Sequence, residues 1–223
     1  GEEKSMGYKI RVFGDRALFS RPELKVERYS YDIPTPSSLV GIAESIYWHP
    51  GLKYVIDRVK VINPIERISV KRNELKSKVS ADKVRKVLEG KKELLYLDRN
   101  QDIAMRNSSI LTNVEYIIEY HFELIPEKMN ETDSEAKFAS IINRRIEKGQ
   151  CYKQPYFGCR EFPAYFERAT GKEVSCYEGE GTREFGLMLY GMDYSDPQHY
   201  TPMFFNAVME NGVVEMGNVE VFR

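Results

Sequence analysis

Segments with the period of a strand and segments with the period of a helix follow one another along this chain in an order that few folds accommodate. "YKIRVFG" (8–14) alternates apolar and polar residues, which predicts a strand. "TPSSLVGIAESIYW" (35–48) predicts a helix, because Thr35 can cap it, Pro36 suits its first turn, and its apolar residues share one face. Further along, the same criteria predict strands over 53–65 and 113–125, a helix over 132–149 and a strand over 156–167.

This order, strand–helix–strand–strand–helix–strand, is the βαββαβ pattern of a ferredoxin-like (RRM-like) α+β domain. We expect that domain to cover residues 7–167, with a basic insertion at about 67–106. Residues 168–223 contain two more strand-like runs and predict a small, mostly-β C-terminal domain. The exposed sheet face of such a domain often binds RNA.

Two local expectations accompany this prediction. Strict alternation in "KYVIDRVKVINPI" places Val55, Asp57, Val59 and Val61 on one face, with Tyr54 and Ile56 on the other. The basic segment that follows is predicted to be mostly loop, with a short helix at "SADKVRKVLEG" (80–90).

Several classes of protein are excluded. No apolar run approaches 18 residues, so no membrane span is expected, and the charged start "GEEKSMGYKIRVFG" is not a signal peptide. The three cysteines and three histidines are scattered and form no CxxC, so we expect no metal site and no cofactor. Reduced cysteines indicate a cytoplasmic protein.

Charge is segregated along the chain although the net charge is only −1. Bases outnumber acids between Arg67 and Lys92, and acids dominate after residue 160. The basic run indicates either a face for a phosphate backbone, including non-specific duplex DNA, or a solvated loop. Aromatic residues adjoin bases at Arg28-Tyr29 and Tyr152-Lys153, a combination that suits unpaired RNA.

Four blocks of the sequence carry a resemblance to a known family. They are "GDRALFSRPELKVERYSYDIPTPSSLVGIAESIYWHP", "NVEYIIEYHFEL", "QPYFGCREFPAYFE" and "PMFFNAVMENGVV". With "VINPI" between the first two, the chain resembles the CRISPR-associated Cas family five, in its type I-C (Dvulg) subtype of the RAMP superfamily. The resemblance runs from about Gly7 to Val214.

The resemblance implies a metal-independent endoribonuclease. Members of this subtype cut precursor CRISPR RNA at the base of its repeat hairpin and keep the 5′ handle. They do so as subunits of a surveillance complex, beside its backbone and large subunits. The family's tyrosine carries over onto Tyr47 and its lysine onto Lys137, but its histidine does not, because that position is Phe138.

Two functions therefore stay open. In the first, the chain is the endoribonuclease, with Tyr47 and Lys137 as catalytic residues and His121 or His49 substituting for the absent histidine. In the second, it only binds RNA and caps the 5′ handle. In either case the residues expected to hold RNA are Arg28, Arg144, Arg145, Lys148, Lys153 and Arg160.

Overall fold

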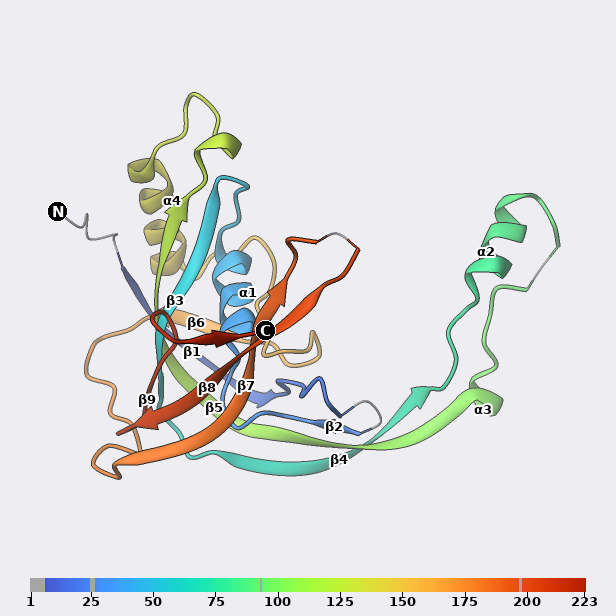
Figure 1. Cartoon of the computed structure of the whole chain (residues 1–223), viewed down its shortest axis with the longest axis horizontal. Helices are drawn as coiled ribbons and strands as arrows, with labels where there is room; N and C mark the ends of the chain where they lie inside the picture. Colours follow the sequence, from blue (N-terminus) through green and yellow to red (C-terminus); the bar gives the residue numbers. More distant parts are fainter. Residues whose placement is uncertain (1–6, 25–26, 93, 197) are drawn as a thin grey trace.

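A large, mostly antiparallel sheet organises the protein (Figure 1). The computed structural model describes residues 7–24, 27–92, 94–196 and 198–223. Four strands form the centre of the sheet in the order β3-β5-β1-β6, and each neighbouring pair is antiparallel. Their bounds are β1 Tyr8–Ala17, β3 Leu52–Val61, β5 Ile103–Leu124 and β6 Tyr165–Arg168. The protein is thus an α+β protein.

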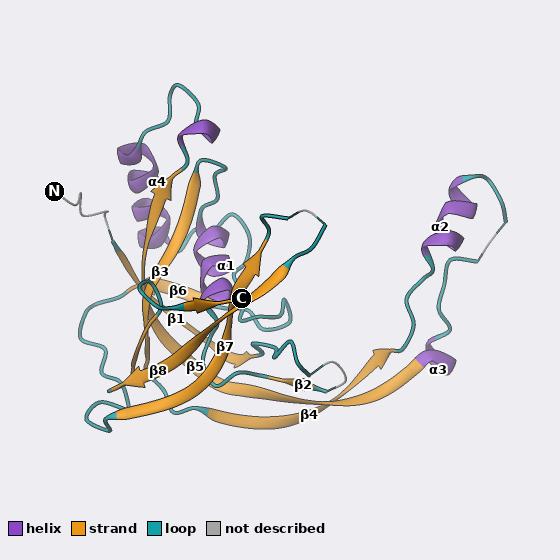
Figure 2. Cartoon of the chain, in the orientation of Figure 1, coloured by secondary structure: helices purple, strands orange, loops and turns teal. Residues whose placement is uncertain are grey.

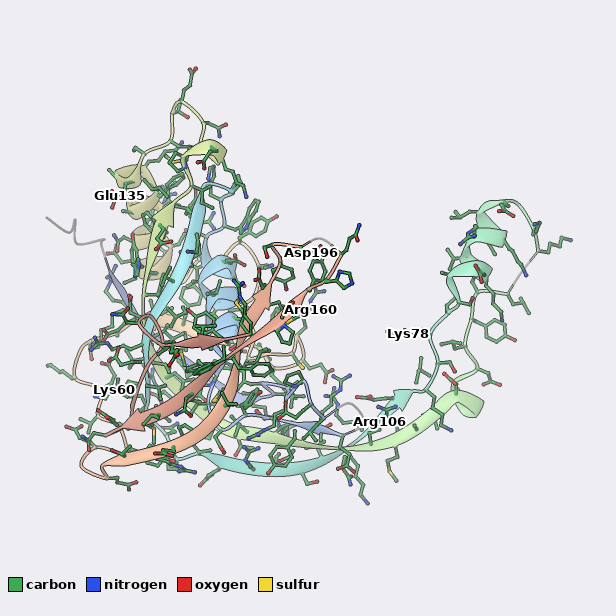
Figure 3. All side chains as sticks on the ribbon, viewed as in Figure 1. Lys60, Lys78, Arg106, Glu135, Arg160 and Asp196 are labelled. Carbon is green, nitrogen blue, oxygen red and sulfur yellow. The ribbon has the colours of Figure 1, made fainter. Side chains whose placement is uncertain are left out.

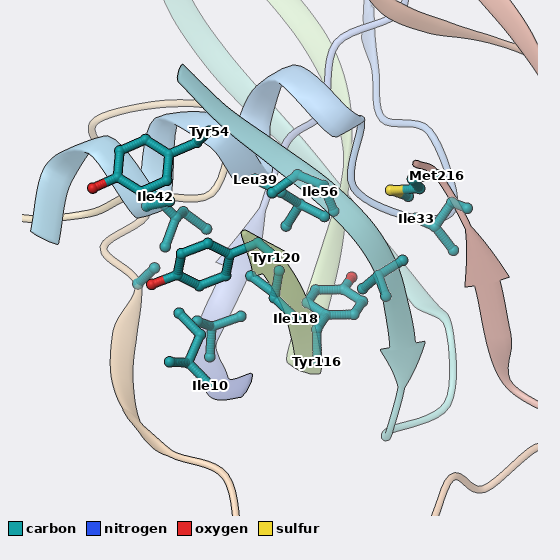
Figure 4. Packing of buried hydrophobic residues seen from close by; sticks show 14 of the residues in the cluster. Ile10, Ile33, Leu39, Ile42, Tyr54, Ile56, Tyr116, Ile118, Tyr120 and Met216 are labelled. Atoms are coloured by element: carbon teal, nitrogen blue, oxygen red, sulfur yellow. The ribbon is translucent and has the colours of Figure 1, made fainter. Parts of the chain in front are cut away.

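Two helices, α1 (Pro36–Ile46) and α4 (Glu135–Lys148), pack on one face of this sheet (Figure 2). Leu39 and Ile42 of α1 meet Ile118 and Tyr120 of β5 in the main core (Figure 4). Phe138 of α4 is wholly buried in the same core. Both helices lie where their apolar periodicity predicted them.

The strands after residue 168 extend the edge of the same sheet. They are β7 (Thr182–Asp193), β8 (Thr201–Glu210), β9 (Val213–Glu215) and β10 (Val221–Phe222). β7 and β8 form a long hairpin, and β9 pairs with both β8 and β3. The C-terminal segment therefore supplies further strands, which are hydrogen-bonded to the central sheet through β9 and β3.

A long arm leaves the body of the protein (Figure 1). Its two strands are β4 (Glu66–Leu75) and the first half of β5, joined through α2 (Ala81–Leu88) and α3 (Arg99–Asp102). At its base, the short β2 (Arg28–Tyr29) pairs with β5. The prediction of a helix within 80–90 is confirmed, but the prediction of a mostly irregular segment is wrong. A two-stranded ribbon with water on both faces shows little apolar alternation, so its sequence carries little strand signal.

The face assignment within β3 is also wrong, because the strand contains a β-bulge. The pairing with β5 shifts between Ile56 and Arg58, which leaves Asp57 as the extra residue. As a result Tyr54 and Ile56 are buried together with Val59 and Val61. Within the described residues no helix is both long and apolar enough to cross a membrane.

Candidate functional site

Tyr47 lies at the C-terminal end of α1. The helix is set at its start by the Thr35 side chain, which accepts the Ser38 N–H, and Pro36 occupies the first turn. Tyr47 follows the last helical residue in an extended conformation, and its carbonyl accepts the Tyr54 hydroxyl at 2.6 Å. Tertiary contacts thus fix the backbone from which the Tyr47 ring projects.

Lys137 lies in the first turn of α4, whose start is close to the end of α1. Ser134 caps this helix by accepting the Lys137 N–H at 3.2 Å, and Gly149 ends it in the left-handed conformation at φ 61°. The Lys137 ammonium contacts the Asp133 carboxylate at 2.9 Å and keeps 43% of its side chain exposed. It is therefore a paired cation that a ligand can still reach.

His49 joins the same two helix ends. Its ring centroid lies 4.7 Å from that of Phe138, and its Nε2 is 3.4 Å from a carboxylate oxygen of Asp133. The Gly51 N–H donates to Nδ1 at 3.0 Å. Because Nδ1 accepts a hydrogen bond, the neutral ring carries its hydrogen on Nε2, which faces Asp133.

Asp133 links these groups, although it was not predicted as a site residue from the sequence. Lys137 and the Asn130 N–H hydrogen-bond its carboxylate and lower its pKa. The signal that could have revealed it is its position four residues before Lys137, a spacing at which opposite charges meet near a helix.

The Tyr47 ring is held among these charges. The guanidinium of Arg145 lies 5.1 Å from its centroid, and Arg145 also donates to the Ile46 carbonyl at the end of α1. Burial raises the pKa of the Tyr47 hydroxyl, and Asp133 raises it further, whereas Lys137 and Arg145 lower it. A raised pKa keeps this phenol neutral near pH 7, so it acts as a hydrogen-bond donor.

Phe138 is a core residue. None of its side chain is exposed, and its ring meets Tyr47, His49 and Phe122 at centroid distances of 6.2, 4.7 and 6.5 Å. It therefore forms the floor beneath the cluster of Tyr47, His49, Asp133 and Lys137, which we call the helix-end cluster.

His121 lies elsewhere. Its neighbours Tyr120 and Phe122 on β5 belong to the core beneath the helices, so alternation directs His121 to the opposite face of the sheet. There its Nδ1 contacts the bulged Asp57 at 2.9 Å. Of the two histidines predicted as substitutes, the structure brings only His49 to Tyr47 and Lys137.

The predicted RNA-binding residues are dispersed. Arg144, Lys148, Lys153 and Arg160 are exposed, and the Lys153 N–H is anchored to the Ser45 carbonyl at 3.2 Å. Arg145 is engaged with α1 and Tyr47, as described above. Arg28 lies at the base of the arm, where it pairs with Glu74 at 3.0 Å. Lys78, farther out on the arm, is well separated from Arg160 (Figure 3).

The helix-end cluster combines a cation, an imidazole and a phenol. Among the described residues no group of three or more His, Cys, Asp or Glu side chains could hold a metal ion. Fold and site thus define an α+β protein on a large antiparallel sheet, with a cluster suited to binding an anion and moving a proton.

The chain belongs to the Cas5d family of CRISPR-associated proteins. The family model described as CRISPR-associated protein (Cas_Cas5) matches residues 7–217. A CRISPR pre-crRNA endoribonuclease Cas5d from Mannheimia succiniciproducens is 38% identical over 213 residues, which cover 93% of each chain. A second protein of that name, from Thermus thermophilus, is 34% identical over 93% of this chain and 90% of its own.

Solved structures agree with this assignment. A crystal structure of a CRISPR-associated protein matches at a TM-score of 0.70 with 27% identity, over 98% of this chain and 97% of the other. A functionally uncharacterized protein from Streptococcus mutans matches at 0.69 with 26% identity, over 98% of both chains.

Proposed function

We propose that this chain is an endoribonuclease that cleaves precursor CRISPR RNA without a metal ion. The observation that carries the proposal is the meeting of Tyr47, His49 and Lys137 around Asp133, at the ends of two helices. Two relatives that match over most of their length bear the name CRISPR pre-crRNA endoribonuclease, which supports the same activity.

Metal-free cleavage of RNA uses the 2′-hydroxyl beside the scissile phosphate as nucleophile. The 2′-oxygen attacks phosphorus, the bond to the 5′-oxygen breaks, and the products are a 2′,3′-cyclic phosphate and a 5′-hydroxyl. One proton leaves the 2′-hydroxyl and another reaches the departing 5′-oxygen. The reaction thus needs a proton carrier and a cation for the charge that develops on phosphate.

Lys137 supplies that cation. It stands in the first turn of α4, where the helix dipole favours an anion, and its exposed ammonium can turn from Asp133 to a phosphate oxygen. Tyr47 donates a hydrogen bond from its neutral phenol and positions the reacting ribose or phosphate.

His49 carries the proton. An imidazole ring can accept a proton at one nitrogen and donate one from the other, so a single side chain can serve as base and as acid. In the free protein both ring nitrogens are engaged, Nδ1 by the Gly51 N–H and Nε2 by Asp133, so RNA binding has to turn the ring and free one nitrogen for the proton. When RNA draws Lys137 away, Asp133 is left to orient and stabilise the imidazolium.

The proposal extends to the fold and to RNA retention. The order β3-β5-β1-β6, with α1 and α4 as crossovers on one face, supports a ferredoxin-like domain over 7–167, and strands β7 to β10 form the smaller β domain over 168–223 that extends its sheet. The hairpin and the 5′ handle are bound by exposed bases distributed over the surface: Arg144, Lys148, Lys153 and Arg160. The retained product then joins the backbone and large subunits of a type I-C complex.

A second candidate function is RNA binding without cleavage. The observation that favours it is the burial of Phe138, which leaves the position of the family histidine without a titratable group. Such a protein caps the 5′ handle with the same exposed bases.

The test is a single-turnover assay with the cognate repeat RNA, protein in excess and EDTA present. We expect a product that ends in a 2′,3′-cyclic phosphate. Lys137→Ala and Tyr47→Phe should each slow its formation by roughly 10²-fold or more while RNA binding persists. Lys148→Ala, a lysine at the other end of α4, serves as the matched control and should affect binding alone. RNA that binds yet stays intact for hours would establish the second function.

A further inference from the structure

A cavity of about 680 Å³ opens along the flank of α1. Val40 and Glu44 form its helical wall, Lys53 and Val55 of β3 form its floor, and Tyr190 and Met203 of the β7–β8 hairpin form the far wall. Its size falls in the range of small-molecule sites, and its lining is mainly apolar with few polar groups. The cavity lies outside the helix-end cluster, but the two are neighbours.

The C-terminal end of α1 connects them. Glu44 lies in the last turn of α1, and Tyr47 directly follows the helix. Tyr54, which also lines the cavity, holds the Tyr47 carbonyl through its hydroxyl. A strand of RNA with a phosphate at Lys137 can therefore place a neighbouring base in the cavity.

The carboxylate of Glu44 is the polar group of the cavity that is available to a ligand. Its side chain is half-buried, yet no hydrogen bond or ion pair to its carboxylate occurs within the described part of the chain. Burial raises the pKa of Glu44, and only the charge of Lys153 opposes the rise. A donor that enters the cavity can bond to this carboxylate, whose hydration is only partly removed by burial.

The wall opposite Glu44 suits a flat ring. The Tyr190 ring packs edge-on against Phe205 at 5.8 Å, which fixes its orientation, and Tyr194 stands exposed at the rim. Aromatic and thioether side chains offer the stacking surface that unpaired bases use.

Among bases, guanine fits a carboxylate best. Its Watson–Crick edge presents two parallel donors, N1–H and the N2 amino group, which both oxygens of one carboxylate can accept. Cytosine and adenine offer one exocyclic amine, and uracil offers one imide N–H. Lys153 partly offsets the negative charge of Glu44 beside RNA. The second carboxylate of the cavity, Glu123, is paired with Lys53 at 2.7 Å.

We propose that this cavity binds one unpaired guanine of the RNA, with Glu44 accepting from its Watson–Crick edge. The inference rests on the proposed function for the identity of the ligand as RNA. It adds a base-reading subsite beside the cutting site.

The test measures fluorescence anisotropy of labelled oligouridine RNAs that carry one central guanosine, inosine, adenosine or uridine. We expect the full chain to bind the guanosine RNA about tenfold more tightly than the adenosine or uridine RNA, with inosine between them because it lacks the N2 amine. Glu44→Gln should abolish the preference. Glu127→Gln, an exposed glutamate on another element, removes the same charge and should keep it.

Equal affinity for the four RNAs, or a guanosine preference that survives in Glu44→Gln with an unchanged melting temperature, overturns the inference. Cleavage of repeat RNA is scored separately. Cleavage without a guanosine preference contradicts the guanine subsite alone. A guanosine preference without cleavage contradicts the proposed endoribonuclease activity and supports the subsite.

Discussion

The imidazole of His49 lies against the ring of Phe138, with 4.7 Å between the two centroids. The sequence resemblance assigns the family histidine to position 138, where this chain has a buried phenylalanine. The structure thus brings a histidine from the other helix end to the side of that phenylalanine. In the proposed mechanism the proton carrier is therefore His49, and Phe138 is the buried residue beneath it.

His49→Ala should therefore slow cleavage by about 10²–10⁴-fold, the range for loss of a general acid or base. Binding of the repeat RNA should change little, because the imidazole pairs with Asp133 in the free protein. Single-turnover rates and equilibrium binding, measured on one preparation, separate the two effects.

His121→Ala provides the comparison, because His121 pairs with Asp57 on the opposite face of the sheet. Its cleavage rate should stay within a few-fold of the unmodified chain. If His121→Ala loses the activity and His49→Ala keeps it, the assignment of the proton carrier is wrong.

Phe138→Ala should destabilise the protein, because it removes a fully buried ring from between α4 and the sheet. The expected loss is about 3–5 kcal/mol in the free energy of unfolding, measured by urea denaturation. Arg144→Ala, an exposed change on the same helix, should fall within about 0.5 kcal/mol of the parent. A small loss in Phe138→Ala would mean that the floor of the cluster is not a packed core.

Sequence pattern predicted the elements that bury one face. α1 and α4 each carry an apolar stripe and a local stop, a C-terminal Pro-Gly pair in one case and Gly149 in the other, so their bounds are encoded locally. The bulge at Asp57 is not encoded locally, because an extra residue in one strand is recognised only when the pairing with the neighbouring strand is known. The strands of the arm were not predicted for a related reason. β4 buries none of its residues, and the first half of β5 buries only Ser108, Ile110 and Leu111, too few to impose a regular alternation.

The site residues also divide into those that the sequence could predict and those that it could not. Tyr47 and Lys137 were predicted through resemblance, each beside a helix end that the sequence also predicted. The choice between His49 and His121 could not be made, because it depends on which face of a strand and which end of a helix meet in space. The role of Asp133 could not be predicted for the same reason, because its contact with His49 joins residues that are 84 positions apart in the sequence.

Asp133→Asn should lower stability in a pH-dependent way. The hydrogen bond from Lys137 lowers the pKa of Asp133 in the folded protein relative to the unfolded chain. Its contribution is therefore fully present above the unfolded-state value of about 3.9 and is lost as pH falls through the folded-state pKa. Melting temperatures of the parent and of Asp133→Asn should differ near neutral pH and converge in acid. A constant difference across that range would show that the carboxylate charge does not stabilise the fold.

The arm provides the last prediction. Leu75 pairs with Ile103, and the Lys76 N–H donates to the Asp102 carbonyl, so an Asn-Gly turn can replace residues 76–102 and close the ribbon. None of the side chains of α2 is buried, and the main core contains no residue of this segment. The shortened chain should therefore keep the melting temperature of the parent.

If the arm binds phosphates, the shortened chain should bind nucleic acid with a weaker dependence on salt. For every phosphate that the protein no longer neutralises, the slope of log affinity against log salt becomes shallower by about 0.9 for duplex DNA and about 0.7 for single strands. We expect a shallower slope for duplex DNA in the shortened chain. A chain with an intact arm but glutamine at Lys83, Lys91 and Lys92 tests whether charge alone is responsible. Identical slopes in all three proteins would show that the bases between residues 76 and 92 are solvated and bind no phosphate.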